Sequence, residues 1–385
     1  MDITTRYPQL KTTRQWFLDH VDDMLQEDTA ICQVPSPSWD EGDRAIFLKD
    51  RFERLGLENV SIDSALNVIG WHKGTGKGPV IMLAAHHDTV FPRGTDLTVT
   101  RKEGRLYAPG IRDNSFGVTS MIWLIEALKA NHIQLPGDLL CVATSGEEGL
   151  GDLKGMKEAM KTYHKEVDYV LVIDGALGGI TNGGITSRRL LVTVTTGGGH
   201  SYGNFGVPSA VHSLGKMIAK IAEIEVPTNP KTTYNVGVIE GGTSVNTIAA
   251  KASFLLDMRS TQRPSLEKVE ERVREIIAEV EKADGVQVGI ELKGDRPGGE
   301  TAEDHPLVVT VQKVLAELGL STETSSSSTD ANVAMAYQVP AVCFGCAYGG
   351  NAHRTDEWLQ IEGIDLGMTL FINSVCSVME LPKRV

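Results

Sequence analysis

Continuous apolar runs alternate with helix-like patterns in the first half of the chain and again near its end. Runs of this kind are expected for strands that are covered on both faces in a mostly parallel sheet. Four such strands are predicted, at residues 80–85, 139–143, 169–173 and 340–344. Apolar residues at helical spacing predict helices, among them 13–27, 42–55, 118–128 and 306–318. This alternation predicts an α/β domain.

The pattern of apolar and polar residues changes after about residue 187. The predicted strands now alternate, which indicates a sheet with one solvated face. They lie at 190–195, 234–240, 252–259 and 286–292, with helices at 209–223 and from residue 264. The order is β-α-β-β-α-β, a small α+β unit. We therefore expect an inserted domain at 188–297, within a larger domain made of 1–187 and 298–385.

Composition and charge narrow the class of protein. The 385 residues carry a net charge of −13, which argues against a general nucleic-acid or anionic-membrane partner. No apolar run approaches the roughly 20 residues that span a bilayer, and the N-terminus does not resemble a signal peptide. Five scattered cysteines do not suggest a disulfide framework, and Cys343-x-x-Cys346 is interpreted as a buried strand end. We expect a cytoplasmic protein.

Acids and histidines follow the predicted buried strands. In open α/β sheets, ligands bind in the crevice beyond the carboxyl ends of the strands, so side chains placed there are expected to converge. Those that follow the four strands are His86, the pair Glu147 and Glu148, Asp174 and His353. A lone histidine or a Glu-Glu pair would mean little, since such a pair is often a solvated helix start. Together they indicate a metal-dependent hydrolytic site.

Asp113 precedes a predicted helix, where a carboxylate alone would be explained as a helix cap. Two divalent ions that lie close together need a carboxylate that bridges them. We assign His86, Asp113 and Asp174 to one ion, and Asp113, Glu148 and His353 to the other. Imidazole and carboxylate ligands without thiolate suit zinc, with manganese or cobalt as substitutes.

The neighbours of these ligands have predicted roles of their own. Asp88 is placed to accept a hydrogen bond from the His86 imidazole and fix its tautomer. His87 would point to the opposite face of the strand and is interpreted as structural. Of the two adjacent glutamates, one can bind an ion while the other transfers a proton from water to the leaving nitrogen.

These stretches resemble a metallopeptidase family that includes peptidase T, carboxypeptidase G, aminoacylase and succinyl-diaminopimelate desuccinylase. The resemblance rests on four motifs in order: 86–90 (HHDTV), 110–114 (GIRDN), 145–149 (SGEEG) and 351–353 (NAH). It implies a mostly parallel-sheet zinc-hydrolase catalytic domain, an inserted lid and dimerisation domain, and two Zn²⁺ per subunit. By position, Glu147 would be the general base, and the ligands would be those assigned above.

The resemblance also implies roles for residues of the inserted domain. Gly199-His200-Ser201 resembles a motif whose histidine reaches a substrate carbonyl, often across a dimer, although His200 could be an ordinary loop residue. Two further lid motifs place Asn246 and Arg259 at the substrate, with a structural ion pair as the alternative for Arg259. The loop after His200 departs from the family, which commonly has a proline two residues after the histidine. Asp174, where other members have glutamate, resembles the aminopeptidase-like branch.

The sequence therefore predicts a two-zinc exopeptidase-type hydrolase that cleaves an amide bond in a short peptide or amino-acid derivative, acting as a homodimer through the lid. The first alternative is an amidohydrolase for N-acyl or N-carbamoyl amino acids, with the same ligands and a different pocket. The second is a metal-dependent peptide-binding protein without catalysis. Glu147 disfavours that second alternative, because a binder would not need the extra carboxylate.

Overall fold

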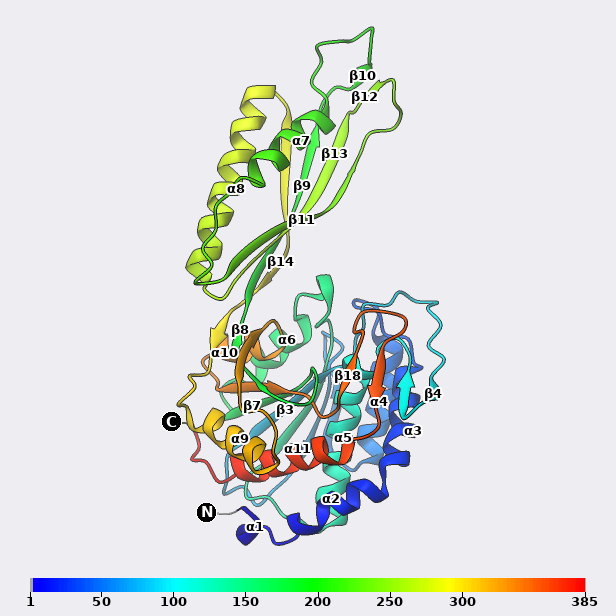
Figure 1. The fold of residues 1–385 in the computed structure, drawn as a ribbon, viewed down its shortest axis with the longest axis vertical. Coiled ribbons are helices and arrows are strands. Elements are labelled where there is room, and N and C mark those ends of the chain that lie inside the picture. The colour runs from blue at the N-terminus through cyan, green and yellow to red at the C-terminus, as the bar shows by residue number, and fades with distance from the viewer. Residues whose placement is uncertain (1–2, 385) are drawn as a thin grey trace. The chain divides into compact units, whose positions relative to one another are not determined.

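The computed structural model describes residues 3–384 and divides into two compact units (Figure 1). The boundaries fall between Gly184 and Ile185 and between Gly299 and Glu300. We call the two flanking segments the main unit and the segment between them the inserted unit. No helix in the described part of the chain is both long enough and apolar enough to cross a bilayer.

The main unit is built on a nine-stranded sheet in the order β1-β2-β6-β3-β7-β17-β8-β15, with β16 beside β8. Its strands are β1 (Glu58–Ile62), β2 (Val68–His72), β3 (Ile81–His86), β6 (Leu139–Thr144), β7 (Tyr169–Ile173), β8 (Ile180–Gly184), β15 (Gly299–Glu300), β16 (Thr324–Ser327) and β17 (Ala341–Phe344). The central strands β6, β3, β7 and β17 run parallel. The α/β class with a mostly parallel sheet is confirmed.

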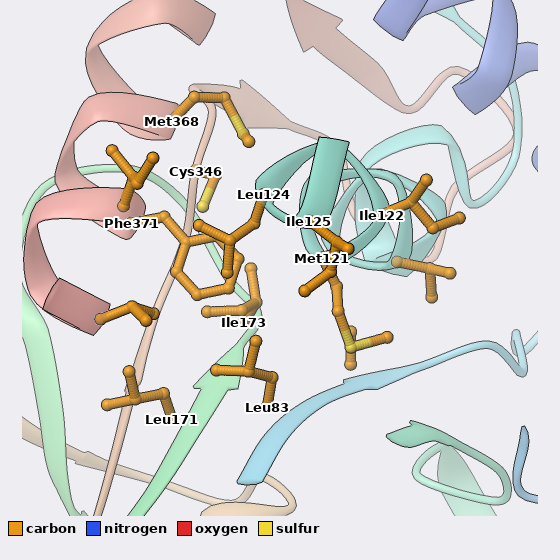
Figure 2. Packing of buried hydrophobic residues seen from close by; sticks show 14 of the residues in the cluster. Leu83, Met121, Ile122, Leu124, Ile125, Leu171, Ile173, Cys346, Met368 and Phe371 are labelled. Carbon is orange, nitrogen blue, oxygen red and sulfur yellow. The ribbon is translucent and has the colours of Figure 1, made fainter. Parts of the chain in front are cut away.

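Helices cover both faces of this sheet, which explains the continuous apolar runs. They are α1 (Ile3–Arg6), α2 (Leu10–Asp19), α3 (Val21–Cys32), α4 (Gly42–Arg54), α5 (Phe116–Ala130), α6 (Lys154–Tyr163), α9 (Pro306–Glu317), α10 (Ala331–Ala336) and α11 (Ile364–Val378). Leu83 belongs to the larger core, with α5 and α11, as Figure 2 shows. Met82 and Ala84 belong to a second core, with α6 and α10. Successive residues of β3 thus enter opposite cores.

Several parts of the main unit differ from the sequence prediction, which did not include the sheet strands β1, β2, β8, β15 and β16. The helix expected at 13–27 is two helices, α2 and α3, because His20 leaves the helical region (φ −114°, ψ 11°) and its ring stacks on Trp16 with the centroids 4.2 Å apart. A small antiparallel sheet was also missed, since its strands are too short to produce a pattern. They are β4 (Thr100–Lys102), β5 (Arg105–Tyr107), β18 (Gly349–Gly350) and β19 (Trp358–Gln360).

The inserted unit has a four-stranded antiparallel sheet in the order β11-β13-β9-β14. Its elements are β9 (Thr186–Thr195), β10 (Gly199–His200), α7 (Ala210–Ile221), β11 (Thr232–Gly241), β12 (Thr247–Ile248), β13 (Lys251–Ser260), α8 (Arg263–Asp284) and β14 (Gln287–Arg296). Alternate residues of β9, Leu190, Val192 and Val194, are buried with residues of α7 and α8. One face of the sheet is therefore covered by two helices.

Candidate active site

The candidate site begins where parallel strands of the main unit end. His86 is the last residue of β3, Glu147 and Glu148 follow β6, and Asp174 follows β7 directly. Since β6, β3 and β7 are parallel neighbours, their carboxyl ends lie at one edge of the sheet. Asp113 comes from the turn before α5 and His353 from the segment between β18 and β19. Five separate parts of the chain thus supply the site.

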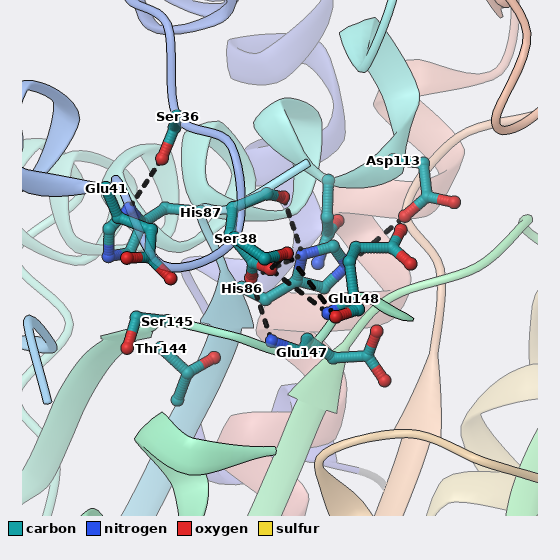
Figure 3. A network of polar contacts seen from close by, with 12 residues as sticks. Ser36, Ser38, Glu41, His86, His87, Asp113, Thr144, Ser145, Glu147 and Glu148 are labelled. Atoms are coloured by element: carbon teal, nitrogen blue, oxygen red, sulfur yellow. Dashed lines mark hydrogen bonds and ion pairs between the residues drawn. The ribbon is translucent and has the colours of Figure 1, made fainter. Parts of the chain in front are cut away.

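Ligand-type atoms of these residues lie within 4.8 Å of one another in three groups. The first group is His86, Asp113 and Asp174, and the second is Asp113, Glu148 and His353. The third consists of His86, Glu147 and Glu148. The structure therefore brings together the residues predicted for each of two ions, with Asp113 common to both sets. Figure 3 shows Asp113, Glu148 and His86 side by side.

His86 is buried and its two ring nitrogens have different surroundings. Nδ1 lies 3.1 Å from the backbone carbonyl oxygen of Asp88 and 3.6 Å from its Oδ1. The sequence predicted that Asp88 accepts a hydrogen bond from His86 and so fixes the tautomer of the ring. In the structure, the backbone carbonyl of Asp88 is closer to Nδ1 than the carboxylate is. Burial lowers the pKa of His86, but Asp113 and Asp88 outweigh burial and raise the pKa well above the ordinary value. With Nδ1 held at the Asp88 carbonyl, Nε2 faces the Asp113 carboxylate, whose Oδ1 is 3.2 Å away. Such a nitrogen is suited to a metal ion.

The Asp88 carboxylate instead organises the loop that carries the two glutamates. Its Oδ1 accepts the Glu147 N–H at 2.9 Å, and its Oδ2 accepts the Glu148 N–H at 3.1 Å and the Ser38 hydroxyl at 2.6 Å. Burial raises the pKa of Asp88, but His86 and these donors outweigh it and hold the pKa well below the ordinary value. Asp88 therefore fixes the direction in which Glu147 and Glu148 leave the backbone.

Glu357 holds the loop of Asp113 in the same way, and sequence reasoning missed it. Its carboxylate accepts the backbone N–H groups of Gly110, Arg112 and Asp113 at 3.1, 2.9 and 2.8 Å. Glu357 is fully buried. Burial and the charge of Asp113 raise the pKa of Glu357 to about 7, against the lowering effect of the three amides. The only signal in the sequence was its place four residues after His353.

Arg112 is a cation directly next to Asp113 in the sequence. Its side chain is 10% exposed, and its Nη2 lies 3.9 Å from Asp113 Oδ2. Within the described residues, its buried Nε and Nη1 have no hydrogen-bond partner. Burial raises the pKa of Asp113, but His353, His86 and the guanidinium outweigh burial and lower the pKa. Burial and the charge of Asp113 raise the pKa of Asp174, and His86 and the guanidinium act in the opposite direction. One arginine among several carboxylates leaves room for further positive charge.

The pKa values of His353 and Asp174, one residue from each ligand group, are both shifted upward. His353 is 55% exposed, and its Nε2 lies 2.9 Å from Glu148 Oε1 and 3.5 Å from Asp113 Oδ2. Hydrogen bonding to Asp113 and Glu148 raises the pKa of His353 to about 10. For Asp174, burial and the nearby charge of Asp113 raise the pKa. A cation held between these groups would offset the repulsion between the carboxylates.

His87 faces away from this cluster, although it is adjacent to His86. Its Nε2 lies 3.0 Å from the Leu66 carbonyl oxygen and its Nδ1 is 3.4 Å from the Ser36 hydroxyl. Burial lowers the pKa of His87 to about 4, so the ring is neutral. None of the three ligand groups in the described chain contains it. Its contacts are those of a structural histidine.

Comparison with known proteins identifies the family. A model of "Peptidase family M20/M25/M40" matches residues 82–376, more than half of the chain. The chain belongs to peptidase family M20/M25/M40. The resemblance inferred from the strand-end motifs is thereby confirmed, and with it the prediction of a metallopeptidase-type hydrolase.

Individual M20/M25/M40-type proteins resemble the chain along most of its length. A succinyl-diaminopimelate desuccinylase of Corynebacterium glutamicum is 26% identical, covering 90% of this chain and 94% of its own. A solved tripeptidase of Staphylococcus aureus superposes with a TM-score of 0.78 at 22% identity, covering 94% and 98%. YXEP of Bacillus subtilis, described as a dinuclear metal-binding peptidase, has a TM-score of 0.68 at 16% identity, covering 94% and 99%. These structures share the fold of the M20 chain.

The M20 chain has its other predicted site residues in the inserted unit. His200 is exposed in β10, and its Nδ1 accepts the N–H groups of Tyr202 and Gly203, both at 3.2 Å. Asn246 is also exposed, and its Oδ1 accepts the Ser244 hydroxyl at 2.8 Å. These two residues lie close to each other in the backbone, since His200 pairs with Thr247 of β12 and Asn246 directly precedes that strand.

Arg259 makes the ion pair that the sequence left open as an alternative. Its Nε donates to Asp257 Oδ2 at 2.7 Å, while Arg189 donates to Oδ1 of the same carboxylate at 2.9 Å. Arg259 is nevertheless 42% exposed, so part of the guanidinium is accessible. The two arginines share the Asp257 carboxylate, and the accessible part of the Arg259 guanidinium is of the kind that binds an anionic group.

Proposed function

We propose that this chain is a two-metal exopeptidase-type hydrolase that cleaves an amide bond in short peptides or amino-acid derivatives. The observation that carries the proposal is the pair of ligand groups that share Asp113. His86 and Asp174 complete one group, and Glu148 and His353 complete the other. A shared carboxylate is the arrangement that two neighbouring divalent ions require.

The residues present fit such ions. Both groups offer imidazole nitrogen and carboxylate oxygen without thiolate, a donor set that suits zinc, with manganese and cobalt as substitutes. His86 Nε2 is a buried nitrogen without a hydrogen-bond partner among the described residues, as expected for an atom that binds a metal ion. Further support comes from the description of YXEP, which has this fold, as a dinuclear metal-binding peptidase. We assign two Zn²⁺ per subunit.

The chemistry divides between the ions and the chain. When bound, the two ions would polarise the substrate carbonyl and make a water molecule acidic at neutral pH. Glu147 takes the proton of the attacking water and returns it to the nitrogen of the leaving group. Asp88 holds Glu147 in place through the backbone N–H, so the proton acceptor is fixed relative to the ligands. His200 stabilises the oxyanion, and Asn246 and Arg259 bind the substrate.

The assembly proposed is a homodimer formed through the inserted unit, which acts as a lid and lets His200 serve the site of the other subunit. The exposed position of His200 on β10 supports this proposal, because the side chain is accessible to another molecule. The aminopeptidase-like branch, suggested by Asp174, and a cytoplasmic location remain predictions from the sequence.

A second candidate function is hydrolysis of N-acyl or N-carbamoyl amino acids. The relative named succinyl-diaminopimelate desuccinylase favours it, since that name describes removal of an acyl group from an amine. Both functions use the same ligands and the same proton transfer, and they differ in the pocket. Binding of peptides without catalysis is a more distant third candidate, which the position of Glu147 beside the ligands disfavours.

The deciding experiment is mass-spectrometric product analysis of zinc-loaded protein with free-amine di- and tripeptides, N-acyl amino acids and N-carbamoyl amino acids. Cleavage of free-amine peptides supports the peptidase, and the released residue shows which end is trimmed. Turnover of blocked substrates alone would establish the amidohydrolase instead. Glu147→Ala is the control, expected to keep both metal ions and lose turnover. Metal binding without any cleavage would overturn the proposal in favour of the binding protein.

A further inference from the structure

Three apolar residues with exposed side chains come from loops that adjoin the candidate active site. Trp39 is 65% exposed, Leu150 45% and Val90 39%. Leu150 comes two residues after Glu148, and Val90 two residues after Asp88. All three lie in the main unit, and Leu150 and Val90 are on loops that also carry site residues. The mechanism described above uses none of them.

The loop of Trp39 is attached to the ligand-bearing loops by several contacts. The adjacent Ser38 donates its hydroxyl to Asp88 Oδ2 at 2.6 Å and its backbone N–H to the Thr89 carbonyl at 3.3 Å. Pro37 forms a parallel bridge with Thr89. Asp88 in turn binds the backbone of Glu147 and Glu148. The position of Trp39 is therefore set relative to the catalytic carboxylates.

The indole ring is fixed as well as exposed. Its Nε1 donates to the Leu150 carbonyl at 3.1 Å, and the Trp39 backbone N–H donates to Glu41 Oε1 at 2.9 Å. The Lys154 ammonium lies 4.9 Å from the ring centroid. A surface tryptophan without a function would not need these restraints, and ordering it beforehand lowers the entropic cost of binding a ligand.

Trp39 also occupies a backbone conformation that a bulky residue rarely adopts. Its φ is +75°, in the left-handed region where glycine is favoured. Strain of this kind persists where the surrounding contacts enforce it and is concentrated at functional sites. A tryptophan at such a position gains nothing from core packing, because most of its side chain is in solvent. Core packing therefore does not account for a large aromatic ring at this position.

Charge selects the kind of ligand that this surface fits. Lys154 is the cation nearest the ring, and its Nζ forms an ion pair with the fully buried Glu41 at 3.0 Å. Its charge is therefore balanced and offers little to an acidic group. The face of an indole and two aliphatic side chains are exposed, and the neighbouring exposed Asp40 is ion-paired with Arg93 at 2.6 Å. Flat aromatic surfaces of this kind bury large apolar groups well.

We propose that Trp39, Leu150 and Val90 form a subsite for an apolar side chain of the substrate residue that flanks the scissile amide. This inference rests on the proposed hydrolytic function and adds a substrate class to it. The enzyme prefers substrates with leucine- or phenylalanine-like residues next to the cleaved bond. Peptides with alanine or with acidic residues at that position are poorer substrates.

The test measures kcat/KM for matched substrates that carry Phe, Leu or Ala next to the scissile bond, on each side of it. Trp39→Gly removes the ring and suits the positive φ, while Trp39→Asn is a second variant that also tolerates it. We expect the Phe-over-Ala ratio to fall by about tenfold or more in both, the size of effect that an apolar pocket gives. Leu150→Ala should lower the same ratio to a smaller degree.

Ile46→Ala is the matched control, since Ile46 is an equally exposed apolar residue of the main unit on α4. It should leave the ratio unchanged, and metal content and thermal unfolding should match the wild type in every variant used. A Phe-over-Ala ratio that survives in Trp39→Gly and Trp39→Asn would overturn the subsite alone. Failure of the wild type to cleave any amide would instead reject the proposed function, and the subsite with it.

Discussion

The main unit and the inserted unit hold their predicted site residues in opposite ways. In the main unit, His86, Asp113 and Glu148 are buried or nearly so and contact one another's loops. In the inserted unit, His200 and Asn246 are exposed, and the side-chain hydrogen bonds described above for them reach residues two or three positions away in the chain. Parallel strand ends force side chains together, whereas loops of an antiparallel sheet do not. The ligand-type residues of the main unit are therefore already assembled, and the side chains of His200 and Asn246 remain accessible to solvent.

Removing the shared ligand gives the largest expected effect. Asp113→Ala should abolish binding of both ions, because Asp113 belongs to both ligand groups, and should lower kcat by roughly 10³-fold or more. Metal content by mass spectrometry and the rate on the best substrate measure both effects. Asp50→Ala, an exposed aspartate on α4, is the control. Retention of one tightly bound ion would show that Asp113 does not bridge.

His200 sharpens the comparison from the side of the inserted unit. His200→Ala should leave metal content unchanged and lower kcat by about 10²-fold, the cost of losing one oxyanion donor. If His200 acts across a dimer, mixing the His200→Ala and Glu147→Ala proteins should restore activity, since one mixed site then has both residues. Absence of recovery in mixtures that are shown to exchange subunits would contradict action between subunits.

Glu357 tests whether the main unit depends on its supporting contacts. Glu357→Ala removes the acceptor of three buried N–H groups, so the affinity for metal should fall by about 10- to 100-fold. The free energy of unfolding should fall by about 3 kcal/mol. Glu357→Gln should recover part of both losses. Chelator competition measures the affinity, and a variant that loses stability but keeps its metal affinity would limit Glu357 to a role in folding.

The smallest expected effect is the contribution of Asp257, in the inserted unit, to the pH dependence of the free energy of unfolding. Burial raises the pKa of Asp257, but Arg259 and Arg189 outweigh it and lower the pKa below the ordinary value. The ionised carboxylate therefore stabilises the folded state above its unfolded pKa of about 4, and this contribution disappears as pH falls through the lower folded-state pKa. Urea unfolding between pH 7 and pH 3 should show a shallower acid loss in Asp257→Asn. Identical profiles would exclude this contribution.

Sequence patterns predicted some elements closely for a physical reason. The strand at 169–173 coincides with β7 because both of its faces are buried and every residue is apolar. The single helix at 13–27 was wrong because the apolar pattern continues across His20, whose backbone leaves the helical region. Strand-end acids could be grouped from order alone. Glu357 could not, because its partners are backbone N–H groups that any sequence would supply.

The two units differ in whether they contain cysteine thiols that a reagent can modify. All five cysteines, buried and unpaired, lie in the main unit, namely Cys32, Cys141, Cys343, Cys346 and Cys376. Burial raises the pKa of Cys141 and of Cys346 to about 12, so neither forms the reactive thiolate while the core is closed. The rate at which a thiol reagent modifies the cysteines would therefore report how often the core of the main unit opens. Motions of the inserted unit would not be detected, because that unit contains no cysteine. The natural cysteines are sufficient for this measurement on the main unit.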